Sequence, residues 1–239
     1  MNRFIRIGII GIIATLLLSA CSLFSNKREV PSRNGMLLIG DEKSLDDIVS
    51  QYKSKIQSNT LYKIKQSKIE GHNTLILKRS TAEEFIKQGL LRRPKDVKSP
   101  VFSDSHPVQS LPDVKEDTTL LLSRFDSMEN IKNLKEIMIN DIKFKVQHDN
   151  PSWFGYIPDS SFEDVIAVVS DAMFNKIPVP ETSMVTLHFK QSYGSLRDGS
   201  VPLDVSDNDV FKNNTEWLRL TKNIKERVKY LKSISFLEK

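Results

Sequence analysis

The chain contains a single cysteine, and its position limits how the rest of the protein can be stabilised. Cys21 stands directly after an apolar stretch, and no cysteine follows it in the sequence. The body of the chain therefore cannot form a disulfide framework, a thiolate nucleophile or a cysteine-based zinc site. A fold beyond Cys21 has to be held together by the packing of its other side chains.

The first 21 residues combine a basic start, an apolar run and small residues before the cysteine. Arg3 and Arg6 supply the positive charge, and residues 7–18 are mostly apolar. A short apolar segment of this kind is typical of a secretory signal, because a spanning helix needs roughly 20 apolar residues. Residues 18–21 (Leu-Ser-Ala-Cys) resemble the lipobox of bacterial lipoprotein signal peptides. The alternative is an uncleaved membrane anchor in which Cys21 is incidental.

The resemblance implies export and lipidation. It implies that Cys21 carries a diacylglyceryl group, that residues 1–20 are removed, and that the new amino group is acylated. Two or more acyl chains hold a protein firmly to a membrane, whereas one chain holds it only marginally. Ser22 rather than Asp follows the cysteine. By resemblance this implies the outer membrane, facing the periplasm, in a Gram-negative cell, and the outside of the single membrane in a Gram-positive one.

Charge and motifs exclude several classes of function. The formal net charge is only +5 at pH 7, and the basic residues are scattered. Nucleic-acid-binding domains usually carry a basic patch or stripe, so we expect no nucleic-acid partner. The sequence has no P-loop, GxGxxG or GxSxG motif, and no cofactor is expected.

Composition divides the chain into segments. Residues 1–20 are predicted to be the signal peptide, and residues 21–35 the lipidated cysteine and a flexible tether. Residues 36–91 and 118–239 both carry strand and helix patterns, whereas residues 92–117 contain four prolines. A structureless loop of this length is unusual inside a compact domain. The sequence therefore predicts an α+β protein of two small subdomains joined by a Pro-rich linker.

Hydrophobic periodicity predicts the elements of each subdomain. In the first, strands are expected at 36–39 and on both sides of a turn at 70–73, with helices after Ser44 and Thr81. In the second, strands are expected at 118–123, 142–146 and 184–190, and a short edge strand at 201–205. Helices are predicted for 127–138, 160–174 and 215–233. Ser160 and Glu163 form a capping box before the second of these helices, which is predicted to be the most buried.

Two sets of aromatic residues are candidate interface residues. Trp153, Phe154 and Tyr156 lie in one loop bounded by prolines, and Trp217 starts the apolar stripe of the closing helix. Trp and Tyr are enriched at protein interfaces. The alternative that we favour for the loop aromatics is that they cap the core, and a third role is to stack on a glycan. For the stripe we favour ordinary packing on a sheet over a partner.

The sequence gives only weak support for an acid–base pair or a metal site. His148 and Asp149 are adjacent on a predicted strand, so their side chains point to opposite faces and do not form a dyad. Residues 204–209 are acidic but lack the order of a calcium loop. The four histidines show no metal-binding spacing, so no metal site is expected.

These observations favour a lipid-anchored, non-catalytic envelope protein. It is attached to the membrane through lipid on Cys21. Its body docks other envelope proteins, as an accessory part of a secretion, conjugation or pilus machine. One alternative is a periplasmic ligand- or glycan-binding lipoprotein, with peptidoglycan as its partner. Another is a periplasmic hydrolase, which requires His148, Asp149, Asp159 and His188 to share a cleft.

Overall fold

The fold was analysed in a computed structural model, which describes residues 32–98, 105–124, 131–156, 162–194 and 208–236. Residues 31–239 form one compact unit. Its helices are α2 (Glu42–Gln51), α3 (Arg79–Lys87), α5 (Asp171–Lys176) and α6 (Asn208–Lys225). Its strands are β1 (Gly35–Gly40), β2 (Ile56–Ile69), β3 (His72–Lys78), β4 (Leu91–Pro94), β5 (Ser105–Pro107), β6 (Thr118–Ser123), β7 (Glu136–Ile139), β8 (Ile142–His148), β9 (Trp153–Phe154), β10 (Val165–Val169), β11 (Glu181–Phe189) and β12 (Tyr230–Ile234).

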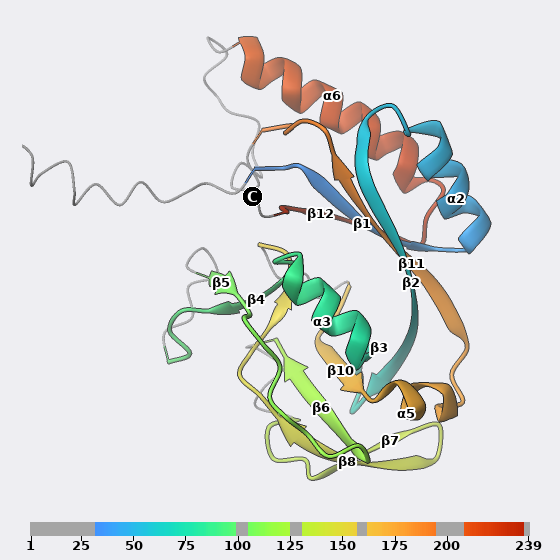
Figure 1. Ribbon diagram of the computed structural model, residues 1–239, viewed down its shortest axis with the longest axis vertical. Coiled ribbons are helices and arrows are strands. Elements are labelled where there is room, and N and C mark those ends of the chain that lie inside the picture. Colours follow the sequence, from blue (N-terminus) through green and yellow to red (C-terminus); the bar gives the residue numbers. More distant parts are fainter. Residues whose placement is uncertain (1–31, 99–104, 125–130, 157–161, 195–207, 237–239) are drawn as a thin grey trace, which may run out of the picture. The chain divides into compact units, whose positions relative to one another are not determined.

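One mixed sheet runs through the whole unit, in the order β12-β1-β11-β2-β3-β10-β6-β8-β7 (Figure 1). The α+β class is therefore confirmed. The structure differs from the expected pair of subdomains, because β3 of the first segment pairs in parallel with β10 of the second. β1 likewise lies between β11 and β12 from the far end of the chain. Strands from both segments alternate in one sheet, so neither segment can bury its strands alone.

The Pro-rich segment 92–117 is part of this unit where the structure describes it. β4 and β5 lie within or beside it and form a small sheet with β9, in the order β5-β4-β9. Val108 and Leu111 from the same segment are buried in the main core. The described parts of this segment are therefore packed against the core and do not form a free linker.

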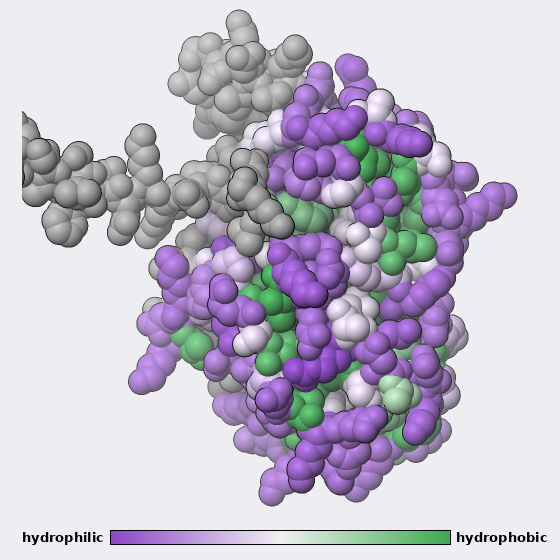
Figure 2. Space-filling model, viewed as in Figure 1, coloured by the Kyte–Doolittle hydropathy of each residue, from purple (hydrophilic) through white to green (hydrophobic). Residues whose placement is uncertain are grey.

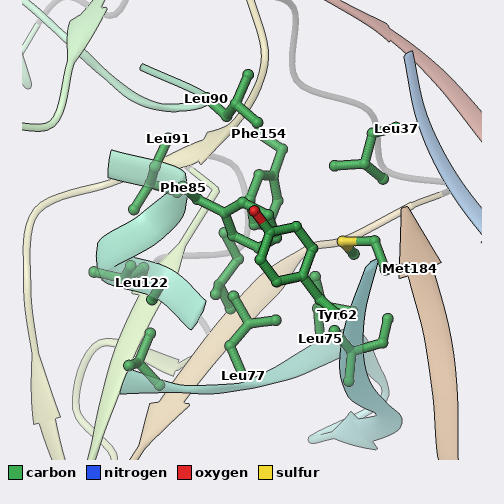
Figure 3. Packing of buried hydrophobic residues seen from close by; sticks show 14 of the residues in the cluster. Leu37, Tyr62, Leu75, Leu77, Phe85, Leu90, Leu91, Leu122, Phe154 and Met184 are labelled. Atoms are coloured by element: carbon green, nitrogen blue, oxygen red, sulfur yellow. The ribbon is translucent and has the colours of Figure 1, made fainter. Parts of the chain in front are cut away.

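The strands of the main sheet bury both faces, and alternate side chains enter different cores. On the first face, side chains such as Tyr62, Leu75 and Leu122 pack under α3 and the small sheet in one cluster (Figure 3). On the second face, the cluster under α2 and α6 includes Leu38 and Leu187. A separate cluster on that face lies between α5, β7 and β8.

Several local predictions are confirmed. The hairpin turn consists of Glu70 and Gly71, whose φ angles are 49° and 82°, as a type I′ turn requires. The strands predicted at 36–39, 118–123, 142–146 and 184–190 correspond to β1, β6, β8 and β11. The first helix is α2, although Asp41 rather than Ser44 caps it, by accepting the N–H of Ser44.

The prediction of a helix over residues 160–174 is wrong. Within the described part of that range, Val165–Val169 form strand β10, and only α5, which begins at Asp171, is helical. A short continuous apolar run fits a strand buried on both faces as well as a buried helix. Ser170 then caps α5 by accepting the N–H of Met173. Glu163 is therefore no capping residue, and its carboxylate is buried instead.

Two other predicted helices also differ from the structure: one contains a strand, and the other ends earlier than predicted. Within the predicted helix 127–138, residues 136–138 belong to strand β7, and residues 127–130 lie outside the described part of the chain. The closing helix ends at Lys225, and Tyr230–Ile234 return as strand β12 beside β1. The last described element is therefore a strand rather than an amphipathic helix. The strand predicted at 201–205 falls outside the described residues.

Lys65 is a buried cation that ties β2 to the end of α5. Its side chain is 3% exposed, and its Nζ donates to the carbonyl oxygens of Phe174 at 2.8 Å and Ile177 at 2.6 Å. Carbonyls at a helix C-terminus lack the N–H partner that they would have inside the helix, and they attract a cation. Burial lowers the pKa of the Lys65 ammonium below its ordinary value.

We expect the stability that Lys65 contributes to increase with pH. The folded state binds this proton less tightly than the unfolded chain does, so stability rises as pH approaches the ordinary lysine pKa of about 10.4. Urea unfolding of the natural chain and of Lys65→Met at pH 7 and pH 10 measures the effect. The natural chain should gain relative to the variant, and a difference independent of pH would contradict the lowered pKa.

Candidate functional site: a polar cleft beside β2

A cleft of about 880 Å³ lies where the first face of the sheet changes from apolar to polar. Tyr62, Ile64 and Met184 belong to the buried cluster of this face. The next side chains of the same parity on β2 and β11 are polar, and they form the floor of the cleft: Thr60, Ser58, Thr186 and His188. We call this space the polar cleft. It is bounded also by Gln57 and Asn59 of β2, by Glu84, Lys87 and Gln88 at the end of α3, by Asn34, Phe236 and by residues 189–192.

Tyr62 closes the apolar core below the polar cleft. Its ring packs edge-on against Phe85 with 4.6 Å between centroids (Figure 3). Its hydroxyl oxygen accepts a hydrogen bond from Gln88 Nε2 at 2.8 Å, and Thr60 and Thr186 also hydrogen-bond this hydroxyl. Burial raises the pKa of Tyr62, so its hydroxyl stays protonated at neutral pH.

Gln88 leaves one hydrogen-bonding atom of the cleft wall unused. Its Nε2 donates to Tyr62 and, at 3.3 Å, to Glu84 Oε1. Its Oε1 is buried and has no donor among the described residues. A buried acceptor without a partner costs stability.

The other end of the polar cleft is closed by Phe236. Asn34 fixes this residue, since Asn34 Oδ1 accepts the N–H of Phe236 at 2.7 Å and Nδ2 donates to its carbonyl oxygen at 3.3 Å. The ring stacks on His188 with 4.5 Å between centroids. It also lies over Gly35, where a Cβ atom would overlap it. The ring can therefore take this place only because residue 35 lacks a side chain.

Gly35→Ala is expected to lower the free energy of unfolding by about 1–3 kcal/mol, the usual cost of overpacking. Chemical denaturation measures the change. In the Phe236→Ala background the same substitution should cost much less, because the overlapping ring is gone. Equal costs in both backgrounds would contradict the placement of Phe236.

The charges around the polar cleft are few and slightly positive. Lys87 and Glu84 lie 3.7 Å apart, on an exposed turn of α3. Lys190 Nζ donates to the carbonyl oxygen of Ser54 at 2.9 Å, and among the described residues it forms no ion pair with a carboxylate. The remaining lining groups are mainly amides and hydroxyls. Such a site binds by hydrogen bonds and suits a neutral or acidic ligand.

The structure buries the aromatic residues predicted as a candidate interface. Trp153 and Phe154 are fully buried, and Tyr156 is 9% exposed. The Phe154 ring contacts Phe85 edge-on at 5.1 Å between centroids. The Arg92 guanidinium lies 5.5 Å from the centre of the Tyr156 ring. These contacts favour the alternative in which the loop aromatics cap the core, and none of the three lines the polar cleft.

Trp217 is also buried, at 4% exposure, within the cluster under α6. Its ring packs edge-on against Phe189, and the Arg33 guanidinium lies 5.4 Å from its centre. The apolar stripe of α6 is therefore used for ordinary packing on the sheet. The exposed apolar residues of the described chain are instead Met138, Ile142 and Leu218.

The residues required by the hydrolase alternative are not brought together where the structure describes them. His148 is bound through Nε2 to the carbonyl oxygen of Leu134, and Asp149 pairs with Arg93 at 2.8 Å. His188 is on β11, which four strands separate from β8. At roughly 4.8 Å per strand, the two histidines lie far apart. Asp159 falls outside the described residues.

The remaining predicted sites cannot be placed in full. Cys21 and the acidic residues 204 and 207 lie outside the described chain. Within the described ranges, no three His, Cys, Asp or Glu side chains gather as metal ligands would. No helix among the described residues combines the length and apolar character needed to cross a membrane.

The residues of the polar cleft were missed by the sequence analysis. Ser58, Thr60, Thr186 and His188 follow ordinary alternation on their strands and carry no motif. Their proximity depends on the register of β2 against β11, in which Thr60 faces Thr186 and Ser58 faces His188. The available signal was the absence of apolar residues from 57–60.

Comparisons with known proteins bear on the whole body of the chain. Residues 33–217 match the family described as "Uncharacterised lipoprotein family". A crystal structure of a candidate lipoprotein from Bacillus anthracis is similar in fold, with a TM-score of 0.63 and 21% sequence identity. The alignment covers 85% of this chain and 99% of that one. No curated protein matches the sequence. The resemblance seen in the sequence covered only the leader, whereas this match assigns the body to a family.

Proposed function

The chain belongs to this uncharacterised lipoprotein family, and on that premise we propose that it is a lipid-anchored, non-catalytic envelope protein whose body docks other envelope components. The lipobox at residues 18–21 and the family of the body support the same class independently. In a Gram-negative cell the proposed location is the outer membrane, facing the periplasm. An accessory role in a secretion, conjugation or pilus machine fits a protein of this kind.

The polar cleft is the observation that most strongly supports the docking role. It presents amides, hydroxyls and a few charges on one wide surface. Its histidine is stacked on Phe236. A surface of several amides and hydroxyls can bind a partner through many hydrogen bonds at once, which supports docking. The face seen in Figure 2 is largely hydrophilic, with small separate apolar groups.

Cys21→Ser is expected to abolish membrane attachment of the mature body. Without the thiol, the precursor stays unprocessed or the body is released. Cell fractionation with an immunoblot measures both outcomes. The nearby substitution Ser22→Thr, which keeps Cys21, serves as the control and should leave attachment unchanged. Attachment of processed Cys21→Ser protein to membranes would contradict the lipid anchor.

Docking is tested by placing a photo-crosslinking amino acid at several exposed positions in intact cells. Suitable positions are Gln57 in the polar cleft, Met138 on β7 and Leu218 on α6, with Asp46 on α2 as the reference. At least one of the first three should give a discrete adduct with an envelope protein, identified by mass spectrometry. If no position yields a protein adduct, the docking role is wrong.

The polar cleft also favours a second candidate function, the binding of a glycan. Its amides and hydroxyls are suited to sugar hydroxyls, and peptidoglycan is the glycan polymer of the bacterial envelope. Titration with soluble peptidoglycan fragments distinguishes the two functions, because a pure docking protein shows no saturable binding to them.

A further inference from the structure

We propose that the polar cleft binds an extended peptide segment of another envelope protein, which adds as a strand to the free edge of β2. The inference rests on the proposed docking function and specifies where the partner binds and in which conformation.

β2 has a free edge beside the polar cleft. It pairs with β11 from Ile56 to Lys65, but on its other side β3 pairs only with residues 65–69. β3 ends at Lys78, where the chain turns into α3 (Figure 1). Among the described residues, no strand pairs with this side of residues 57–64. Every second residue there directs its N–H and C=O away from β11.

The polar cleft contacts this edge and not only one face of the strand. Successive side chains of a strand point to opposite faces, so a cavity against one face touches every second residue. Here the consecutive residues 57–60 all line the cleft and all are exposed. The backbone groups between them are therefore accessible from the cleft.

Along residues 57–60 the edge lacks the devices that usually prevent strand addition. Natural edge strands are protected by lysine, proline or inward charges, whereas residues 57–60 are Gln, Ser, Asn and Thr. Instead the edge is set into a recess beside Glu84, Lys87 and Gln88 of α3. A recess admits a single extended segment more readily than the folded edge of a second copy of this chain.

The lining chemistry indicates which segment fits. A strand along residues 57–61 covers about 17 Å at ~3.4 Å per residue. Its alternating N–H and C=O groups match those of β2. The charges of Lys87 and Lys190 exceed that of Glu84, which favours neutral or acidic side chains. Glycans carry no alternating backbone donors and acceptors, so the free edge favours a peptide.

The test uses a phage-displayed library of random linear dodecapeptides, panned on the full chain in detergent. Enriched peptides are synthesised, and hydrogen exchange of the chain is followed with and without them. Successive N–H groups of a strand point to opposite sides, so only one of Ser58→Pro and Asn59→Pro removes an outward donor. That variant should keep its thermal midpoint, because edge strands tolerate such a proline, and should bind the peptides at least 10-fold more weakly. The alanine substitution at the same position keeps the backbone donor and should bind the peptides more tightly than the proline variant.

The proposal predicts slower amide exchange within residues 57–61 when peptide is bound. It is wrong if no peptide is enriched, or if enriched peptides leave exchange at 57–61 unchanged. It is also wrong if peptidoglycan fragments rather than peptides slow exchange there, or if β2 edges pair in a dimer seen by sedimentation. Should both proline variants unfold, hydrogen exchange alone decides. Cross-links from Met138 or Leu218 in cells would then show that docking stands and uses another surface.

Discussion

Replacing Trp153 by Ala is expected to lower the free energy of unfolding by about 3–5 kcal/mol, the usual cost of truncating a buried aromatic side chain. Trp153 is fully buried, and it lies on β9, which pairs with β4. Its neighbour Phe154 packs in the main core. The loss of the ring therefore leaves a cavity where β9 meets the core. Urea denaturation followed by circular dichroism measures the change.

Leu218→Ala is the matched control for this prediction. Leu218 is apolar but 59% exposed on α6, so its truncation should change stability by no more than ~0.5 kcal/mol. If Trp153→Ala were as stable as the control and only lost a partner, the aromatic loop would be an interface after all. A large loss of stability would show that the aromatic loop packs in the core.

Lys232→Met is expected to destabilise the protein by about 3–5 kcal/mol, because it leaves a buried carboxylate without its cation. Lys232 Nζ lies 3.5 Å from Glu163 Oε1, and these side chains are 6% and 1% exposed. Glu163 Oε1 also accepts the N–H of Phe154 at 3.1 Å. Glu163 thus joins β9 to β12, two short strands that are distant in sequence. Thermal and urea unfolding measure the loss.

The double variant Lys232→Met with Glu163→Gln should be less destabilised than Lys232→Met alone, since no charge is then left buried without its partner. Lys145→Met provides the exposed comparison. Lys145 pairs with Asp117 at 2.7 Å, but both side chains are more than half exposed, and loss of such a pair should leave the unfolding midpoint unchanged. Equal effects of Lys232→Met and Lys145→Met would contradict the burial of the Glu163 pair.

The sequence predicted correctly those elements whose structure depends mainly on interactions between neighbouring residues. The alternation in β8 and the turn at Glu70 and Gly71 depend on neighbouring residues, and both were predicted correctly. β10 was taken for a helix, because Val165–Val169 are buried on both faces and carry no alternation. β12 was taken for the end of a helix, because only its pairing with β1 makes residues 230–234 a strand.

The candidate site was harder to predict than the fold class. The polar cleft depends on which residues of β2 face β11, on where α3 ends, and on Phe236 crossing Gly35. None of these relations is visible in a local pattern. The aromatic residues, by contrast, were conspicuous in the sequence and are packed in the interior. The aromatic cluster that stood out in the sequence therefore belongs to the buried interior and not to a binding surface.

The lipid anchor is tested most directly by mass spectrometry of the N-terminal tryptic peptide from protein extracted from membranes. Cleavage after Lys27 should yield a peptide that begins at Cys21 and carries a diacylglyceryl group, with residues 1–20 removed. A peptide that runs from Ile7 to Lys27, with an unmodified Cys21, would contradict the proposal that this protein is held to the envelope by lipid.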